Sequence, residues 1–313
     1  MITLEHVYIL TGLMGLVFAA LSARDASNPK RYGNAAFWGL LSVSFLFGSH
    51  MTDLENGLVV IALIVVGGFG LMHKGAAATT TPQERSASAA AHGNALFVPA
   101  LIVPVVALLG TLLFKNLGLV DPKQATLVFL GLGVLIALGV CYAWLRPPVL
   151  APMEEGRRLI DTIGWAAVLP QMLASLGAVF ALSGVGNAVG HLATQYLPLG
   201  TPFACVVAYC LGMALFTIVM GNAFAAFPVM TAAIGLPLIV HRFGGDPIIM
   251  SAIGMLAGFC GTLLTPMAAN FNLVPAALLE LPDRNGVIRA QAPTALMLLV
   301  ANTGLMAALV YRF

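Results

Sequence analysis

The sequence predicts an all-α membrane protein that crosses the bilayer several times, and three observations support this fold class. Of its 313 residues, 60% are hydrophobic and only 8% are charged, whereas about 25% of the residues of a soluble domain are charged. The mean hydropathy is +0.97. Several uncharged runs exceed the roughly 18–20 residues that a helix needs to cross a bilayer. A net charge of +2 is too small to indicate nucleic acid as a partner, so the lipid bilayer is the expected surrounding.

The N-terminal part of the chain is expected to contain six membrane spans. They cover residues 6–22, 33–52, 57–73, 94–114, 124–145 and 159–182. Residues 75–93 are rich in Ala, Thr and Ser, so they bury too little to fold and are predicted to form a flexible loop. Lys and Arg gather after the first, third and fifth spans, which predicts that these loops are cytoplasmic and that the N-terminus lies outside. We divide the chain into a scaffold-like part, 1–158, and a transport-like half, 159–313.

The transport-like half contains a helix break within an uncharged region. No Asp, Glu, Lys or Arg occurs between Asp161 and Arg242. Gly221 permits backbone angles that other residues resist, and Pro228 lacks an amide donor, so a helix should break between them. The arm that follows, 229–240, is about 18 Å long and too short to span, which favours a re-entrant hairpin over residues 201–240. The alternative is an ordinary turn between two full spans.

A second break is predicted within residues 247–281. The segment from Thr265 to Pro275 contains two prolines and two asparagines within eleven residues, which should unwind a span near its middle. Residues 292–311 then form the last span. Broken backbone at membrane depth is tolerated only where it is buried in protein or lines a cavity, so the two breaks indicate a transporter site built from discontinuous helices.

The chemistry of the two breaks suits a small carboxylate and a small cation. Half-helix N-termini present free amides and the positive end of a dipole to an anion, and freed carbonyls and Asn side chains suit a cation. The candidate substrate-binding residues are Gly221, Asn222, Ala223, Thr265, Pro266, Asn270 and Asn272. The candidate ion-binding residues are Asn222, Thr262, Thr265 and Asn270. We expect no cofactor, and Na⁺ or H⁺ as the coupling ion.

Each of these residues also has a simpler interpretation. The asparagines could hydrogen-bond between packed helices, and the threonines could bond back to their own helix. Asp161 follows the basic loop closely, so it could be interfacial, or it could be a buried functional acid. His50 is expected to be structural or interfacial.

Residues 221–228 (GNAFAAFP) and 261–272 (GTLLTPMAANFN) resemble the most specific motifs of the bacterial domain-of-unknown-function family 979, and the resemblance covers nearly the whole chain. It implies one subunit of a two-subunit permease for 5-oxoproline (pyroglutamate) in the bacterial cytoplasmic membrane, with a second, smaller membrane protein as the other subunit. More distantly, a hairpin followed by a broken span resembles half of an elevator carrier of the ion-transporter superfamily. The hairpin tip of those carriers reads Ser-Asn-Thr, and the tip here lacks both hydroxyls.

Two other classes of function compete with a secondary carrier. An intramembrane enzyme would need a nucleophile with a base or a metal cluster, and the sequence contains neither GxSxG nor HExxH, so we expect no enzymatic activity. A non-transporting membrane scaffold would not need two polar helix breaks. The absence of a second copy of the 220–228 pattern fits a partner that supplies the other half of the carrier.

Overall fold

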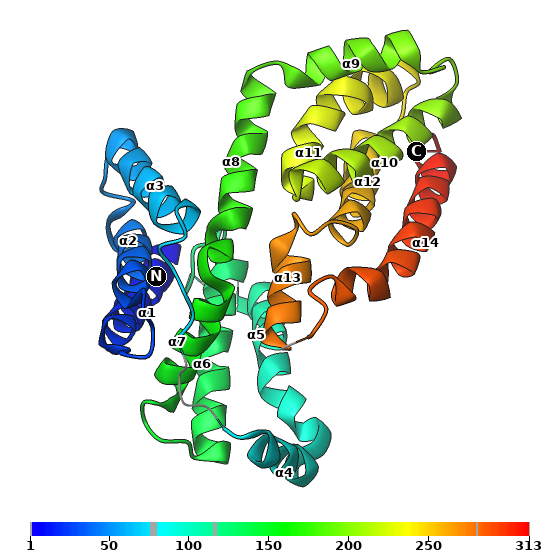
Figure 1. The fold of residues 1–313 in the computed structure, drawn as a ribbon. Coiled ribbons are helices and arrows are strands. Elements are labelled where there is room, and N and C mark those ends of the chain that lie inside the picture. The colour runs from blue at the N-terminus through cyan, green and yellow to red at the C-terminus, as the bar shows by residue number, and fades with distance from the viewer. Residues whose placement is uncertain (1, 76–79, 115–117, 280, 313) are drawn as a thin grey trace. The chain divides into compact units, whose positions relative to one another are not determined.

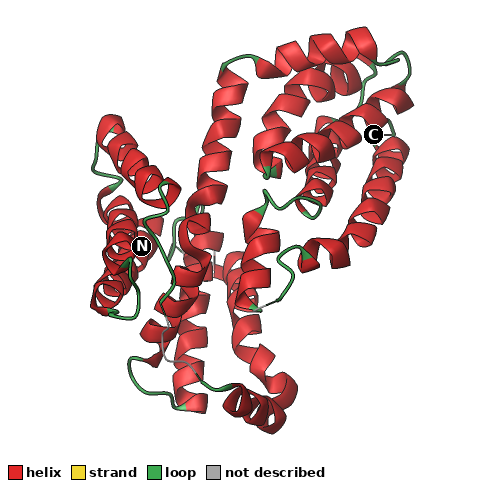
Figure 2. Ribbon diagram, in the orientation of Figure 1, coloured by secondary structure: helices red, strands yellow, loops and turns green. Residues whose placement is uncertain are grey.

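The computed structural model describes residues 2–75, 80–114, 118–279 and 281–312 (Figure 1). Within these ranges every regular element is helical (Figure 2), and extended backbone pairs only in an isolated β-bridge between Ile2 and Val120. Seven of the described helices are long and apolar enough to cross a membrane. The predicted fold class, an all-α protein with several membrane spans, is therefore confirmed.

The chain divides into two compact units, Met1–Gly164 and Trp165–Phe313. The first unit pairs α1 with α2 and α5 with α6. Its elements are α1 (Leu4–Arg24), α2 (Arg31–Phe47), α3 (Asp53–Gly68), α4 (Pro82–His92), the 3₁₀-helix η1 (Gly93–Phe97), α5 (Val98–Phe114), α6 (Ala125–Leu145) and α7 (Ala151–Ile163).

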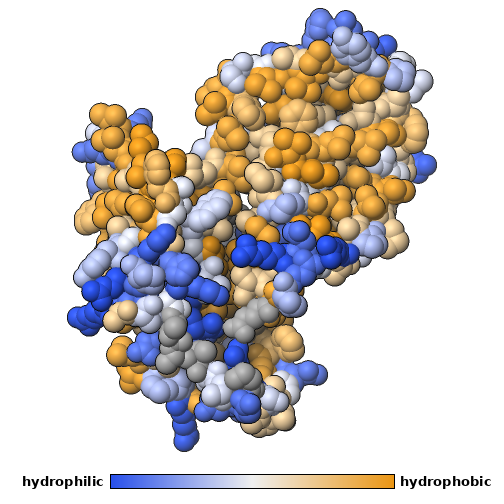
Figure 3. All heavy atoms as spheres, viewed as in Figure 1, coloured by the Kyte–Doolittle hydropathy of each residue, from blue (hydrophilic) through white to orange (hydrophobic). Residues whose placement is uncertain are grey.

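The second unit packs α10, α11, α12 and α14 around one apolar core. Its elements are the 3₁₀-helix η2 (Gly164–Val168), α8 (Leu169–Leu182), α9 (Val185–Tyr196), α10 (Pro202–Met220), α11 (Ala223–Met230), the π-helix η3 (Thr231–Arg242), α12 (Pro247–Thr262), α13 (Ala269–Leu278) and α14 (Gly286–Leu309). Apolar side chains cover most of the visible surface of this unit, and hydrophilic ones gather toward its ends (Figure 3).

The prediction of a flexible loop over 75–93 was wrong for residues 82–92, which form α4; residues 76–79 lie outside the described ranges. A capping box starts this helix. The Thr81 hydroxyl accepts a hydrogen bond from the Glu84 amide at 3.2 Å, and the Glu84 carboxylate accepts one from the Thr81 amide at 2.7 Å. These two bonds satisfy first-turn donors, and the alanines that follow have the highest intrinsic helix propensity.

The predicted span 159–182 is interrupted at Gly164, where α7 ends and η2 begins. Gly164 has φ 60° and ψ −142°, and Gly93, between α4 and η1, has φ 51° and ψ −137°. Side chains resist this region of the backbone map, so glycine suits both positions. Each glycine starts a G-x-A-x-x-x-P sequence, at 93–99 and 164–170, and each leads through a 3₁₀-helix into an apolar helix. The same helix-break motif therefore occurs once before α5 and once before α8.

The hairpin arms have nearly equal lengths, which corrects the prediction of one long and one short arm. The first arm, α10, has 19 residues, and the second runs from Ala223 to Arg242 with 20 residues, so each is long enough to cross a membrane. Only Gly221 and Asn222 separate them. Pro228 lies inside α11 and does not end it, because the helix continues past the missing amide into the wider turns of η3.

Candidate functional site

The two predicted helix breaks meet at one pocket in the second unit. The break between α10 and α11 and the break between α12 and α13 both contribute to its wall, and α8 completes it. The pocket is lined by Leu169, Leu173, Gly221, Asn222, Phe224, Phe259, Thr262, Met267, Asn270 and Phe271. None of these side chains carries a charge, so any ligand selectivity must come from amides, hydroxyls and helix ends.

The first break is a tight reversal at Gly221. This residue has φ 74°, and its amide donates to the Thr217 carbonyl at 2.7 Å. A Cβ atom at Gly221 would lie 2.6 Å from the carbonyl oxygen of Met267, so the hairpin tip touches the second break directly. Asn222 then caps α11, because its Oδ1 accepts a hydrogen bond from the Phe224 amide at 2.8 Å.

The second break is held open by a buried amide network. Asn272 is fully buried, and its Nδ2 donates to the carbonyls of Thr262 at 2.8 Å and Thr265 at 2.6 Å. The Gln291 amide, on α14, donates to Asn272 Oδ1 and, at 3.2 Å, to the Leu263 carbonyl. Carbonyls freed by the end of α12 therefore find partners inside the protein, as buried backbone groups require.

The two threonines near this break make different contacts. Thr265 Oγ1 donates to the Ile218 carbonyl at 2.8 Å and accepts from the Met267 amide at 3.2 Å, so it ties the second break to the end of α10. Thr262 Oγ1 donates to the Phe259 carbonyl of its own helix at 2.6 Å. Thr262 therefore lines the pocket, but its hydroxyl already donates its hydrogen bond to the backbone.

The start of α13 is the polar part of the pocket with the fewest internal partners. No side chain caps this helix at Ala268. The Phe271 amide donates to the Ala268 carbonyl at 3.0 Å, so the amides of Ala269 and Asn270 are the first-turn donors available to a ligand. Asn270, in that first turn, is exposed and lines the pocket, and its side chain makes no hydrogen bond with the described residues. An amide group and a helix N-terminus thus lie together where an anion can reach them.

The structure therefore separates the predicted site residues into two groups. Gly221, Asn222, Thr262 and Asn270 line the pocket. The other four do not: Ala223, Thr265 and Asn272 are buried around the breaks, and Pro266 is exposed on the connection between α12 and α13.

Sequence reasoning missed the apolar wall of the pocket. The rings of Phe224 and Phe259 lie edge to face with centroids 5.9 Å apart, and Phe271 lies beside them in the lining. Phe224 follows Asn222 by two positions and Phe271 follows Asn270 by one, and this closeness in sequence could have indicated that both rings line the pocket. Phe259 and the α8 residues Leu169 and Leu173 come from apolar runs that give no such signal.

The two ionisable residues singled out from the sequence lie outside this pocket, in the first unit. Asp161 is buried inside the protein, with 6% of its surface exposed. His50 is exposed just beyond α2. Within the described ranges, no three His, Cys, Asp or Glu side chains gather closely enough to hold a metal ion.

Comparison with curated proteins and with solved structures finds no match. A family model does match, and it covers residues 5–311. That range contains every helix bordering the pocket. The chain therefore belongs to the family described as protein of unknown function (DUF979).

Proposed function

We propose that this chain is a subunit of a secondary-active permease for a small carboxylate, with 5-oxoproline as the substrate. The supporting observation is that two helix breaks, distant in sequence from each other, line one pocket that has an uncapped helix N-terminus on its wall. A pocket of this kind offers hydrogen-bond donors without placing a permanent charge inside a membrane protein, where charges are costly.

The lining matches the parts of 5-oxoproline. Its carboxylate would lie at the first turn of α13, where backbone amides and the Asn270 side chain donate hydrogen bonds. Its lactam group has one donor and one acceptor, and the Asn222 amide can serve either. The small ring would pack against Phe224, Phe259 and Phe271, as ligand sites usually combine an apolar wall with a few polar groups.

The permease would also need a coupling ion and a second subunit. Na⁺ or H⁺ would drive accumulation, with Asn222, Thr262, Thr265 and Asn270 as the nearby oxygen-bearing side chains. The pocket uses one hairpin and one broken span, which is half of the parts of a two-repeat carrier site. We therefore propose a second, smaller membrane subunit that supplies the other half, and a location in the bacterial cytoplasmic membrane.

Uptake of radiolabelled 5-oxoproline tests this function. Cells that express both subunits should accumulate the label, and cells that express either subunit alone should not. Unlabelled 5-oxoproline should compete, whereas its primary amide, which keeps the ring but lacks the negative charge, should compete much less. A stable two-subunit complex that transports neither 5-oxoproline nor other small carboxylates would instead indicate a scaffold.

A further inference from the structure

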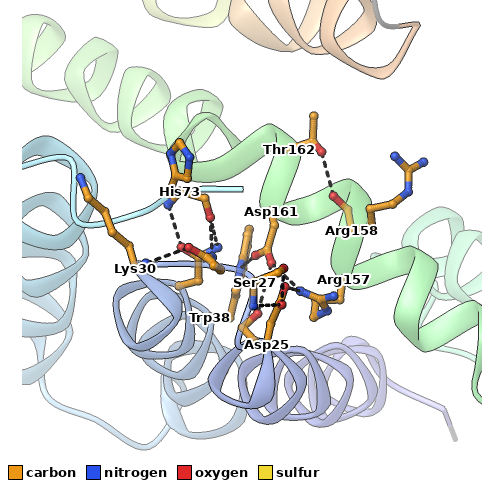
Figure 4. A network of polar contacts seen from close by, with 12 residues as sticks. Asp25, Ser27, Lys30, Trp38, His73, Arg157, Arg158, Asp161 and Thr162 are labelled. Carbon is orange, nitrogen blue, oxygen red and sulfur yellow. Dashed lines mark hydrogen bonds and ion pairs between the residues drawn. The ribbon is translucent and has the colours of Figure 1, made fainter. Parts of the chain in front are cut away.

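The first unit contains a buried charged cluster that the proposed binding pocket does not use. It consists of Asp25, in the connection after α1, and of Arg157 and Asp161, one turn apart on α7 (Figure 4). Arg157 and Asp161 are the buried charged residues of the described ranges. The Asp161 side chain is 2% exposed, and those of Asp25 and Arg157 are each 10% exposed.

One nitrogen of Arg157 serves both carboxylates, and it does so unequally. Arg157 Nη1 lies 2.7 Å from Asp25 Oδ2 and 3.3 Å from Asp161 Oδ2. Asp25 also accepts hydrogen bonds from the amide, at 3.0 Å, and from the hydroxyl of Ser27. Burial alone would raise the pKa of Asp25, but the Ser27 bonds and the Arg157 ion pair outweigh it and lower that pKa. Asp25 therefore stays ionised, and it is the closer of the two carboxylates that pair with Arg157.

Asp161 is left mainly with neutral partners. The Trp38 indole, on α2, donates to Asp161 Oδ1 at 2.8 Å, and the Ser22 hydroxyl, on α1, lies 3.4 Å from Asp161 Oδ2. The Asn34 amide also faces it from α2. With both carboxylates ionised, the cluster carries two negative charges against one positive charge, and a single proton makes it neutral.

Other cationic groups nearby do not supply the missing charge. The Lys30 ammonium donates to the Gly70 carbonyl at 2.6 Å, and His73 meets Asn34 through its backbone. Arg158 pairs with Glu155 on α7. The charged groups that face Asp161 within the described part of the chain are thus Arg157 and, beyond it, Asp25.

We propose that Asp161 is an exchangeable proton-binding site. The geometry around it accommodates both protonation states. Trp38 can donate to Oδ1 in either state, while Ser22 can donate to an ionised Oδ2 or accept from a protonated one, because a hydroxyl has both capacities. A carboxylate that served only as a fixed ion-pair partner would not need a neighbouring hydroxyl that can both donate and accept a hydrogen bond. Resting on the proposed function, the further consequence is that this proton is the one that couples transport.

Infrared difference spectroscopy of the purified chain in lipid tests the proton site without any substrate. The C=O stretch of a protonated, buried carboxylic acid should disappear reversibly as the pH is raised. Asp161→Asn should abolish this band change. Glu155→Gln is the matched control, because Glu155 lies on the same helix but is paired with Arg158 at the surface, and it should leave the band unchanged. A wild-type spectrum without a titrating acid, or one that Asp161→Asn does not alter, would overturn the proposal.

Coupling is tested separately, in liposomes containing both subunits. Asp161→Asn should abolish accumulation driven by a pH gradient but preserve exchange of external for internal 5-oxoproline, because exchange needs no net proton movement. Accumulation that persists in Asp161→Asn would overturn the coupling role. If the wild type neither accumulates nor exchanges 5-oxoproline, the proposed substrate is wrong, and the infrared result still decides whether Asp161 binds a proton.

Discussion

The two helix breaks that border the pocket are built differently. The break at Gly221 and Asn222 is short, depends on a left-handed glycine and ends in a helix whose first turn is capped by Asn222. The break at 263–268 is longer, is held by the side chains of Thr265, Asn272 and Gln291, and ends in a helix with no side-chain cap. The first break therefore fixes the shape of the pocket, whereas the second leaves donors for a ligand.

The largest effect is expected where the two breaks touch. Gly221→Val forces a β-branched residue into a left-handed conformation and pushes its Cβ into the Met267 backbone, which lies 2.6 Å away. Together these penalties should destabilise the protein by roughly 3–5 kcal/mol. The unfolding midpoint of detergent-purified protein measures this. Gly304→Val is the control, since a Cβ on that glycine of α14 meets nothing within 4 Å; equal midpoints for the two variants would show that the breaks do not touch.

The next largest effect concerns the support of the second break. Asn272→Ala removes a hydrogen-bond partner from the Thr262 and Thr265 carbonyls and from the Gln291 amide. The Gln291 amide keeps the Leu263 carbonyl and the Thr265 carbonyl keeps the Ala268 amide, but losing buried hydrogen bonds is unfavourable. We expect a loss of about 2–3 kcal/mol in stability, seen as a lower unfolding midpoint. Asn187→Ala, at an exposed position on α9, should not change the midpoint. An Asn272 variant as stable as the Asn187 variant would mean that the break holds itself open.

A smaller effect on stability is expected at Asn222, where two substitutions distinguish helix capping from ligand binding. Asn222→Ala removes the bond to the Phe224 amide and should lower stability by about 1 kcal/mol, as well as weakening substrate binding. Asn222→Asp keeps a capping oxygen, so stability should be retained, but it places a negative charge in the pocket that receives an anionic substrate and should abolish binding. If Asn222→Asp binds 5-oxoproline normally, the substrate does not occupy the part of the pocket next to the first break.

The smallest expected effect tests the contrast between the neutral pocket and the charged cluster of the first unit. The folded-state pKa of Asp25 lies below its ordinary value of 3.8, so its stabilising contribution is complete above that value and disappears as the pH falls through the folded pKa. The unfolding midpoint of the wild type should therefore drop below about pH 4. Asp25→Asn should lower the midpoint at neutral pH and reduce this acid-dependent drop, and an unchanged pH profile would contradict the assigned ion pair.

Much of the fold was predictable because hydrophobic runs and prolines act locally. The apolar runs located the helices, and Gly221 located the first break. The second break was predicted from Thr265 to Pro275, but it ends at Ala268, and Pro275 lies inside α13. The lengths of the hairpin arms were not predictable in the same way. Pro228 was expected to extend the break, but a proline inside an apolar helix with tertiary packing on several sides is tolerated when neighbouring turns widen, as they do in η3.

The roles of the polar residues were less predictable than their positions. Asn270 and Asn272 are two positions apart in one motif, yet Asn270 lines the pocket and Asn272 is buried in a structural network. Residues two positions apart on a helix do not face the same way, so the sequence could indicate that only one of them faces a ligand, but not which. The Asp25–Arg157 contact joins residues more than a hundred positions apart, and no local pattern reveals it.

In the proposed permease, the uncapped start of α13, with Asn270, binds the carboxylate. Equilibrium binding of labelled 5-oxoproline to the purified two-subunit complex tests it most directly, with wild type, Asn270→Ala and the control Asn187→Ala compared. Losing one hydrogen bond to a charged group should weaken binding by about 10- to 150-fold in Asn270→Ala, with the unfolding midpoint unchanged and the control like wild type. Wild-type affinity in Asn270→Ala would contradict the claim and leave both breaks as structural features of the fold.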